Sequence, residues 1–385
     1  MARRCFAWAM PPFAATILAT AEPPIPAARA WAARYRGQHG PALDLTQAVP
    51  GYPPHPELLE RLARAAGDAG WAGYGPIQGE APLREALAAD AAAFYEAPIT
   101  AGQVAITAGC NLAFAMAMKV IAAPSDAVII PIPWYFNHAM ALQMGGVEAT
   151  PLPGLDPDPG QAEALITPRT RALLLVSPNN PTGAALPPAT LEAMAEMCRR
   201  RGLWLVLDET YRDFLDAPPH RLFESHADVL VHLYSFSKAY CLPGHRLGAV
   251  IAGERFQAQL AKALDTLQIC PARPAQAALA WAIPALAEWR AGNRAIMAAR
   301  AEACRAALAG HEVAALGAYF AWLRLPAEAP DALEAAEFLA AERGLMTLPG
   351  PFFGPGQDRH LRLAFANAEA GRLAELPTRL DFSRG

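Results

Sequence analysis

Short apolar runs that alternate with helical patterns restrict the fold of this 385-residue chain more than any other feature. The runs are QVAIT, DAVIIPIP, RALLLV, LWLVL, VLVHLY and RLGAVIAG, and patterns rich in Ala, Leu and Met separate the first of them. Apolar strands that alternate with amphipathic helices are typical of a mostly parallel sheet covered on both faces. The sequence therefore predicts an α/β fold.

Two helices are expected before this alternation begins. PELLERLARAA at 56–66 and APLREALAADAAAFY at 81–95 are rich in Ala, Leu and Arg, which favour helix. A further Ala-rich helical stretch, from about 275 to 310, leads out of the sheet region. The segments YFAWLRLP and HLRLAFA then indicate a smaller α+β domain.

The length of the chain favours two domains rather than one core. We expect a large domain over residues 45–275, with the mostly parallel sheet between its helices. The small domain is expected to combine an N-terminal arm, residues 1–44, with residues 276–385.

Composition excludes several classes of protein. The net charge is −4 and 18% of residues are charged, so no basic surface for nucleic acid is expected. No uninterrupted apolar run reaches membrane length. The six cysteines are scattered without a CxxC pair or a Cys/His cluster, which favours reduced thiols in a cytoplasm over disulfides or a metal site.

The N-terminal segment MARRCFAWAMPPFAATILATAE leaves two interpretations open. Two arginines, an apolar stretch and the sequence ATA resemble a secretory signal. Pro11 and Pro12 would break the helix of such a signal, so we favour an N-terminal arm of a cytosolic protein.

Polar or glycine-rich residues follow each predicted strand, at the sheet edge where ligands bind in open α/β folds. In TAGCN (107–111), the amides of Gly109, Cys110 and Asn111 could hold an anion at a helix N-terminus. A tight turn between strand and helix explains the same residues equally well.

Two further clusters follow strands in the same way. In SPNNPTG (177–183), Asn180 could donate to a ligand oxygen, although the segment also reads as a simple turn. In DETY (208–211), Asp208 comes directly after LWLVL, and a carboxylate there needs a cationic partner. A helix N-cap or an ion pair with an arginine is the alternative for Asp208.

The segment SFSKAYCLPGHRLG contains a lysine beside hydroxyls and an arginine. Ser235, Ser237 and Arg246 form a set that suits a phosphate dianion. Lys238 lies beside them, and a desolvated lysine near other cations has a lowered pKa and can act as a nucleophile. A solvated surface charge is the alternative for a lone lysine. One ligand, a pyridinium phosphate that carries an aldehyde, would explain all these clusters: Lys238 forms its Schiff base and Asp208 pairs with its ring nitrogen.

With these motifs the chain resembles the class I/II aminotransferases, which are pyridoxal-phosphate enzymes of fold type I. Arg246 follows Lys238 by eight positions, and Asn180 precedes Asp208 by 28, as in that family. The resemblance covers most of the chain. It implies pyridoxal 5'-phosphate as cofactor, with Asn180 and Tyr211 on the phenolic oxygen of its ring.

The segment PWYFNH (133–138) resembles the part of the family that stacks an aromatic ring on the cofactor. Tyr135 is the favoured stacking residue and Trp134 the alternative, while plain core packing remains open for either ring. His138 would then contact Asp208. The resemblance thus makes Lys238, Asp208 and Tyr135 the catalytic candidates.

Three more residues take expected roles from the resemblance. Tyr74, in YGPIQGEAPLR, would reach the phosphate of a neighbouring subunit, which implies a homodimer. Arg362, in FFGPGQDRHLRLAFA, would bind the substrate α-carboxylate, whereas Arg359 is expected to be a surface arginine. Ala48 stands where the family usually has glycine, near that carboxylate.

The resemblance implies transfer of an amino group between an amino acid and a 2-oxo acid, with Lys238 as the base that moves the α-proton. No second arginine for an acidic side chain can be identified, which favours neutral, apolar or aromatic donors. A lyase such as a C–S β-lyase, a synthase or a decarboxylase on the same fold is the main alternative. A DNA-binding regulator and an inactive binding protein are less compatible with the motifs.

Overall fold

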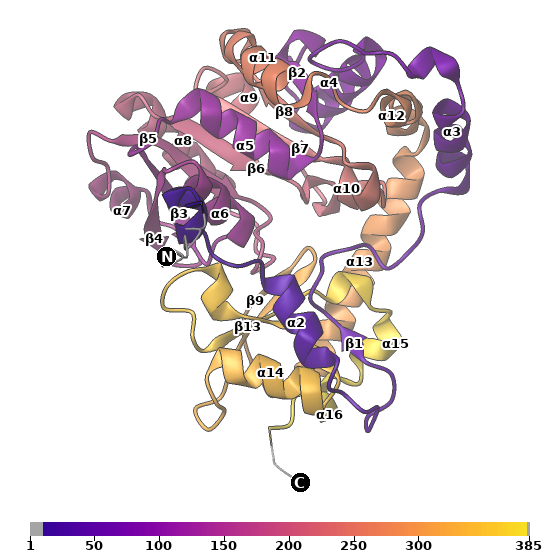
Figure 1. The fold of residues 1–385 in the computed structure, drawn as a ribbon, viewed down its shortest axis with the longest axis vertical. Coiled ribbons are helices and arrows are strands. Elements are labelled where there is room, and N and C mark those ends of the chain that lie inside the picture. The colour runs from indigo at the N-terminus through magenta and orange to yellow at the C-terminus, as the bar shows by residue number, and fades with distance from the viewer. Residues whose placement is uncertain (1–10, 383–385) are drawn as a thin grey trace, which may run out of the picture.

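A seven-stranded sheet forms the centre of the larger part of the molecule in the computed structural model, which describes residues 11–382 (Figure 1). The strand order is β2-β8-β7-β6-β5-β3-β4, and β8 alone runs against its neighbours, antiparallel to both β2 and β7. The mostly parallel α/β sheet predicted from the sequence is confirmed. Its strands are β2 (Val104–Thr107), β3 (Ala127–Ile132), β4 (Glu148–Pro153), β5 (Thr170–Val176), β6 (Trp204–Asp208), β7 (Leu230–Ser235) and β8 (Gly248–Ala252).

The two faces of this sheet are covered by different helices because side chains alternate along each strand. On β6, Leu205 and Leu207 join the apolar cluster that contains helices α3, α4, α8, α9 and α12, while Val206 joins the cluster with α5, α6 and α11. Their bounds are α3 (Pro56–Ala66), α4 (Ala81–Tyr95), α5 (Cys110–Ile121), α6 (Phe136–Met144), α8 (Pro188–Arg201), α9 (Leu222–Ser225), α11 (Glu254–Gln268) and α12 (Arg273–Ala285). The helices expected at 56–66 and 81–95 are confirmed.

Shorter elements complete the large part. They are α7 (Pro159–Ala164), α10 (Phe236–Ala239) and the 3₁₀ turns η1 (Ala69–Trp71), η2 (Ala101–Gln103), η3 (Arg212–Phe214) and η4 (Pro243–His245).

A four-stranded sheet, in the order β12-β13-β10-β9, forms the smaller part. It packs with α14 in a separate apolar cluster, and β1 pairs in parallel with β11 beside it. The elements are β1 (Leu43–Asp44), β9 (Glu312–Gly317), β10 (Phe320–Arg324), β11 (Leu345–Met346), β12 (Leu348–Pro349), β13 (His360–Leu363), α14 (Ala332–Glu342), α15 (Ala370–Leu373), α16 (Leu376–Arg379), η5 (Gly350–Phe353) and η6 (Phe365–Asn367).

The long helix α13 (Ala287–Ala307) runs from the larger part to the smaller part, as Figure 1 shows. The N-terminal segment carries α1 (Ala15–Ala19), which packs on α6, and α2 (Pro24–Ala32), which packs on α14. The domain limits 45–275 and 1–44 plus 276–385 stay a prediction.

Five strands were not predicted from the sequence: the two-residue strands β1, β11 and β12, and the longer β4 and β9. β4 and β9 have partly exposed, mixed patterns in which few apolar residues alternate, so their pairing within a sheet is what stabilises them. The signal-peptide interpretation rests in part on residues 1–10, which lie outside the described residues. Over residues 11–382, no helix is both long enough and apolar enough to span a bilayer.

Candidate active site

The predicted polar clusters meet at one edge of the large sheet. β2, β3, β5, β6 and β7 all end at this edge, and the antiparallel β8 begins there. The segments 107–111, 133–138, 177–183 and 208–211 and the lysine segment therefore lie side by side, although they come from distant parts of the chain.

A cavity of about 350 Å³ opens at this edge, which is within the usual size of a cofactor or ligand site. Its walls come from the strand ends, from the N-terminal segment and from the small part of the molecule. The lining includes Pro23, Pro24, Ile25, Thr46, Gln47, Ala48, Val49, Cys110, Asn111, Tyr135, Phe136, Asn137, Val176, Asn180, Asp208, Thr210, Tyr211, Ser235, Ser237, Lys238, Pro243, Arg246 and Arg362.

Lys238 lies on the short helix α10 and is not a solvated surface charge. Its Nζ donates to the carbonyl oxygen of Ala48 at 2.6 Å. Burial lowers its pKa to about 8, and the positive charges of Arg362 and Arg246 act in the same direction. About a tenth of the amine is therefore unprotonated at pH 7, far more than for a lysine of ordinary pKa.

Asp208 ends β6 on the face that carries α5 and α6, and its side chain is buried. His138 Nε2 lies 3.1 Å from Asp208 Oδ2, and the amide of Thr210 donates to Oδ1 at 2.9 Å. Burial alone would raise the pKa of Asp208, but the hydrogen bonds and charge of His138, with those of Thr210, outweigh it and hold the pKa below its usual value. The expected contact with His138 is confirmed, and no arginine is needed to keep this carboxylate ionised.

The residues expected to hold an anion lie at the cavity near the start of α5. Ser235, Ser237 and Arg246 line the cavity, and Gly109 caps the helix with a φ of +93°. A Cβ atom at Gly109 would overlap the guanidinium of Arg246. The glycine thus lets the cation, the first amides of α5 and the two hydroxyls share one site.

Arg362 lies on β13 and reaches the cavity from the small part of the molecule. Its Nη1 donates to Asn180 Oδ1 at 3.0 Å, its Nη2 donates to the carbonyl of Thr46, and its buried Nε has no partner among the described residues. Burial lowers its pKa to about 10, so the guanidinium is still charged at neutral pH. Arg359 does not line the cavity and donates to the carbonyls of residues 326, 329 and 330.

Two tyrosines face the cavity. Tyr135 lines it and accepts a hydrogen bond from Asn137 Nδ2 at 2.8 Å, whereas Trp134 lines neighbouring cavities instead. Tyr211 is buried, and this burial, followed by the effect of Tyr135, raises its pKa well above 10. Tyr211 therefore keeps its proton and can donate it in a hydrogen bond.

Of the two remaining candidate residues, one lines the cavity and the other does not. Ala48 lines the cavity, and its carbonyl is the acceptor for Lys238. Tyr74 does not line the cavity of its own chain, and 82% of its surface is exposed.

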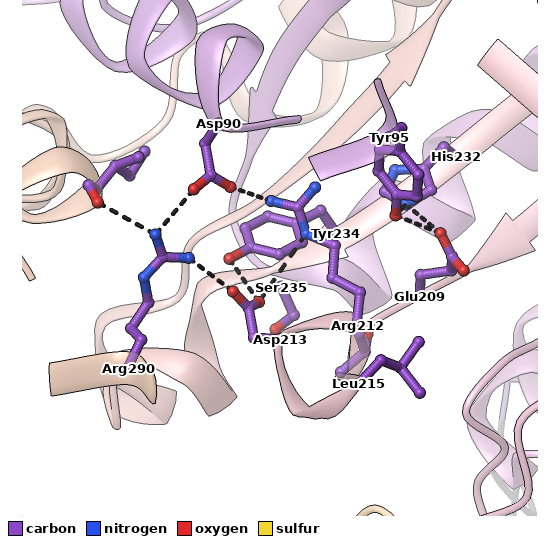
Figure 2. A network of polar contacts seen from close by, with 12 residues as sticks. Asp90, Tyr95, Glu209, Arg212, Asp213, Leu215, His232, Tyr234, Ser235 and Arg290 are labelled. Carbon is purple, nitrogen blue, oxygen red and sulfur yellow. Dashed lines mark hydrogen bonds and ion pairs between the residues drawn. The ribbon is translucent and has the colours of Figure 1, made fainter. Parts of the chain in front are cut away.

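Sequence reasoning missed a network of polar side chains outside the cavity lining (Figure 2). Arg290 on α13 donates to Asp213 Oδ1 at 2.7 Å and to Asp90 Oδ1 at 2.8 Å. Arg212 also donates to Asp90, and Tyr234 donates to Asp213 at 3.0 Å. The network links α4, the segment after Asp208 and α13 through hydrogen bonds. No sequence motif identifies it, because its residues lie far apart in the chain.

A second buried cluster lies on the opposite face of β6 from Asp208. Glu209 accepts from Tyr95, and its Oε2 lies 3.1 Å from His220 Nε2 and 3.0 Å from His232 Nε2. Burial alone would raise the pKa of Glu209, but His220 and His232 outweigh it and hold the pKa far below its usual value. An acidic residue next to Asp208 in sequence is thus part of the support and not of the cavity.

The residues present fit pyridoxal phosphate. A lysine amine with a lowered pKa suits its aldehyde, the ionised Asp208 suits a protonated ring nitrogen, and the set around Arg246 suits its phosphate. Asn180 and Tyr211 complete the lining with groups that can donate to a ring oxygen.

Comparisons with known proteins agree with this chemistry. The family model described as aminotransferase class I and II matches residues 41–380. The chain is 30% identical to the aromatic aminotransferase ISS1 of Arabidopsis thaliana over 354 residues, and the aligned region covers 88% of each chain. It is also 30% identical over 315 residues to the aspartate/prephenate aminotransferase of Thermus thermophilus, covering 77% of this chain and 79% of that one.

Solved structures share the fold. The aspartate aminotransferase of Thermus thermophilus with maleate superposes with a TM-score of 0.87 at 26% identity, over 96% of this chain and 99% of that chain. Substrate-bound BacF of Bacillus subtilis superposes with a TM-score of 0.88 at 23% identity, over 96% and 97%, and this likeness concerns the fold alone.

Proposed function

Because the chain belongs to the class I and II aminotransferases, which use pyridoxal phosphate, we propose that it moves the amino group of a neutral, apolar or aromatic amino acid to a 2-oxo acid. The names of its relatives do not select a donor, since they include aromatic, aspartate/prephenate and arginine–pyruvate aminotransferases. All of the relatives that we compared are named aminotransferases or transaminases, which gives no support to a lyase, a synthase or a decarboxylase.

The observation that carries this proposal is the charge of the cavity wall. Within the described residues, its only cationic side chains are those of Lys238, Arg246 and Arg362. The proposal assigns the first to the amine chemistry, the second to the phosphate and the third to the substrate α-carboxylate. No cation is left for a side-chain carboxylate, whereas Ile25 and Phe136 offer apolar surface.

Lys238 is the proposed base. Its Nζ, with a pKa near 8, can take the α-proton of the donor and return it. Pyridoxal phosphate, when bound, supplies the aldehyde that carries the amino group and a ring that delocalises the charge left on the α-carbon. Asp208 would hold the protonated ring nitrogen with its negative charge, and Tyr211 keeps a proton that it could donate to the ring oxygen.

Arg362 is proposed to orient the donor. A guanidinium binds a carboxylate through two parallel hydrogen bonds, and Asn180 already fixes the plane of this one through Nη1. The unpartnered Nε adds a buried donor at the same place.

A donor panel tests the proposal. The holoenzyme is mixed with single amino acids and its cofactor absorption is followed, then a 2-oxo acid is added to restore the original spectrum. Conversion by neutral or aromatic donors, with a kcat/KM at least tenfold above that of aspartate and glutamate, is expected. Conversion by aspartate or glutamate alone would refute the assignment of the donor.

We also propose a homodimer in which Tyr74 reaches the phosphate site of the partner. The supporting observation is that Tyr74 is exposed next to the exposed Ile77, and that the Gly75 amide contacts Cys270 Sγ at 3.4 Å, close to the exposed Leu267 and Ile269. A monomer in sedimentation, or unchanged cofactor affinity in Tyr74→Phe, would contradict this. The five free cysteines of the described residues support a reducing cytoplasm as the site of action, which cell fractionation tests.

A further inference from the structure

A second cavity of about 310 Å³ adjoins the active-site cavity. The two cavities share two lining residues, Pro24 and Phe136. Pro24 begins α2 and is buried, and Phe136 begins α6. These two side chains are thus the partition between the cavities.

The second cavity is mostly apolar near this partition and acidic at one side. Trp134, Met140 and Phe352 line it together with Phe136. Glu22 and Asp358 also line it; both residues are exposed, and neither carboxylate has a hydrogen-bond or ion-pair partner between residues 11 and 382. An apolar chain gains from this lining, whereas an anionic group would meet two carboxylates without a cation.

We propose that this second cavity is a distal subsite for the amino donor and receives side chains longer than a benzyl group with an apolar or aryl end. The inference rests on the proposed function above, because it needs a donor without a side-chain carboxylate.

The direction of the bound donor supports this subsite. With the α-carboxylate at Arg362 and the α-carbon near Lys238, the side chain must leave through the wall that binds neither carboxylate nor cofactor. Pro24, Ile25 and Phe136 are apolar residues of the cavity lining, and Pro24 and Phe136 also line the second cavity. A short side chain ends at this wall, and a longer one passes Phe136 into the second cavity.

The test compares donors of increasing length on the holoenzyme. They are 2-aminopentanoate, 2-aminooctanoate, 2-amino-5-phenylpentanoate and, as an anionic match for the second, 2-aminooctanedioate. We expect kcat/KM for 2-amino-5-phenylpentanoate to exceed that for 2-aminopentanoate at least about tenfold, because each methylene buried in an apolar pocket contributes about tenfold or more. The carboxylate-ended donor is expected to lose this gain.

Variants then locate the subsite. Met140→Trp fills the second cavity from α6, and Pro351→Trp fills it from η5, should the first variant fail to fold. Met144→Trp is the matched control, since Met144 lies one turn further on α6, is exposed and lines neither cavity. We expect the ratio of kcat/KM for the long and short donors to fall at least about tenfold in the two filling variants and to stay within about twofold of wild type in the control.

The outcomes separate the two proposals. If only aspartate and glutamate react, the proposed donor class fails. If neutral donors react but the length ratio is unchanged in Met140→Trp and Pro351→Trp, or falls equally in Met144→Trp, the distal subsite is refuted while the donor class stands.

Discussion

Removal of Arg290 is expected to destabilise the protein more than removal of any surface arginine on the same helix. Arg290 is 13% exposed and bridges Asp90 and Asp213, which are 18% and 9% exposed. Arg290→Met would leave two nearly buried carboxylates without this partner, although Arg212 and Tyr234 still contact them. Removing one partner of a buried ion pair lowers the free energy of unfolding by about 3–5 kcal/mol. Because Arg212 and Tyr234 still contact the two carboxylates, we expect a loss of about 3 kcal/mol here.

Arg294 provides the matched control. It lies one turn further along α13, is 34% exposed and pairs at 3.7 Å with Asp216, which is fully exposed. Arg294→Met should therefore cost less than about 1 kcal/mol. Because a chain of 385 residues unfolds with a large entropy, we expect the midpoint of thermal unfolding of the holoenzyme to drop by about 4 °C in Arg290→Met and by no more than about 1 °C in Arg294→Met.

A double variant sharpens the interpretation. Asp213→Asn combined with Arg290→Met removes opposite charges that contact each other, so its loss should be smaller than the sum of the two single losses. A shift in Arg290→Met no larger than that in Arg294→Met, or strict additivity in the double variant, would refute the idea that this network holds α13 on the large part.

Three further predictions concern the cofactor. Lys238→Ala should abolish transamination while pyridoxal phosphate still binds noncovalently, and near-normal turnover would show that the site is misassigned. Covalent capture of the cofactor by the apoprotein, followed by absorbance, should rise with pH around a midpoint near 8, because only the unprotonated Nζ reacts and protons occupy it below that pH. Arg362→Met should move this midpoint upward, since it removes a positive charge that lowers the pKa of Lys238; an unchanged or lower midpoint would contradict that cause. Gly109→Ala should raise the Kd for the cofactor at least about tenfold, because the new methyl group overlaps Arg246 at a backbone φ of +93°. Gly253→Ala is the control, since its methyl group has room and should leave the Kd unchanged. Equal Kd values in titrations of the two variants would count against the proposed phosphate site.

Many of the residues that line the cavity could be predicted from the sequence, because each lies next to a strand that its apolar run identifies. Asp208 ends a continuous apolar run, Lys238 follows another, and parallel strands bring such ends together. The helices at 56–66 and 81–95 have strong local propensity and no competing turn residues, so their limits agreed with the structure.

The amino-acid sequence by itself determined the residue types, their order and the strand ends at which they sit, because these depend on local periodicity and composition. Only the tertiary structure decided that Arg290 meets Asp90 and Asp213, that Pro24 of the arm lines the same two cavities as Phe136, and that Arg362 also lowers the pKa of Lys238. The physical reason is that burial and charge pairing depend on residues far apart in the chain, whose approach is settled by how helices and sheet pack and not by any local pattern.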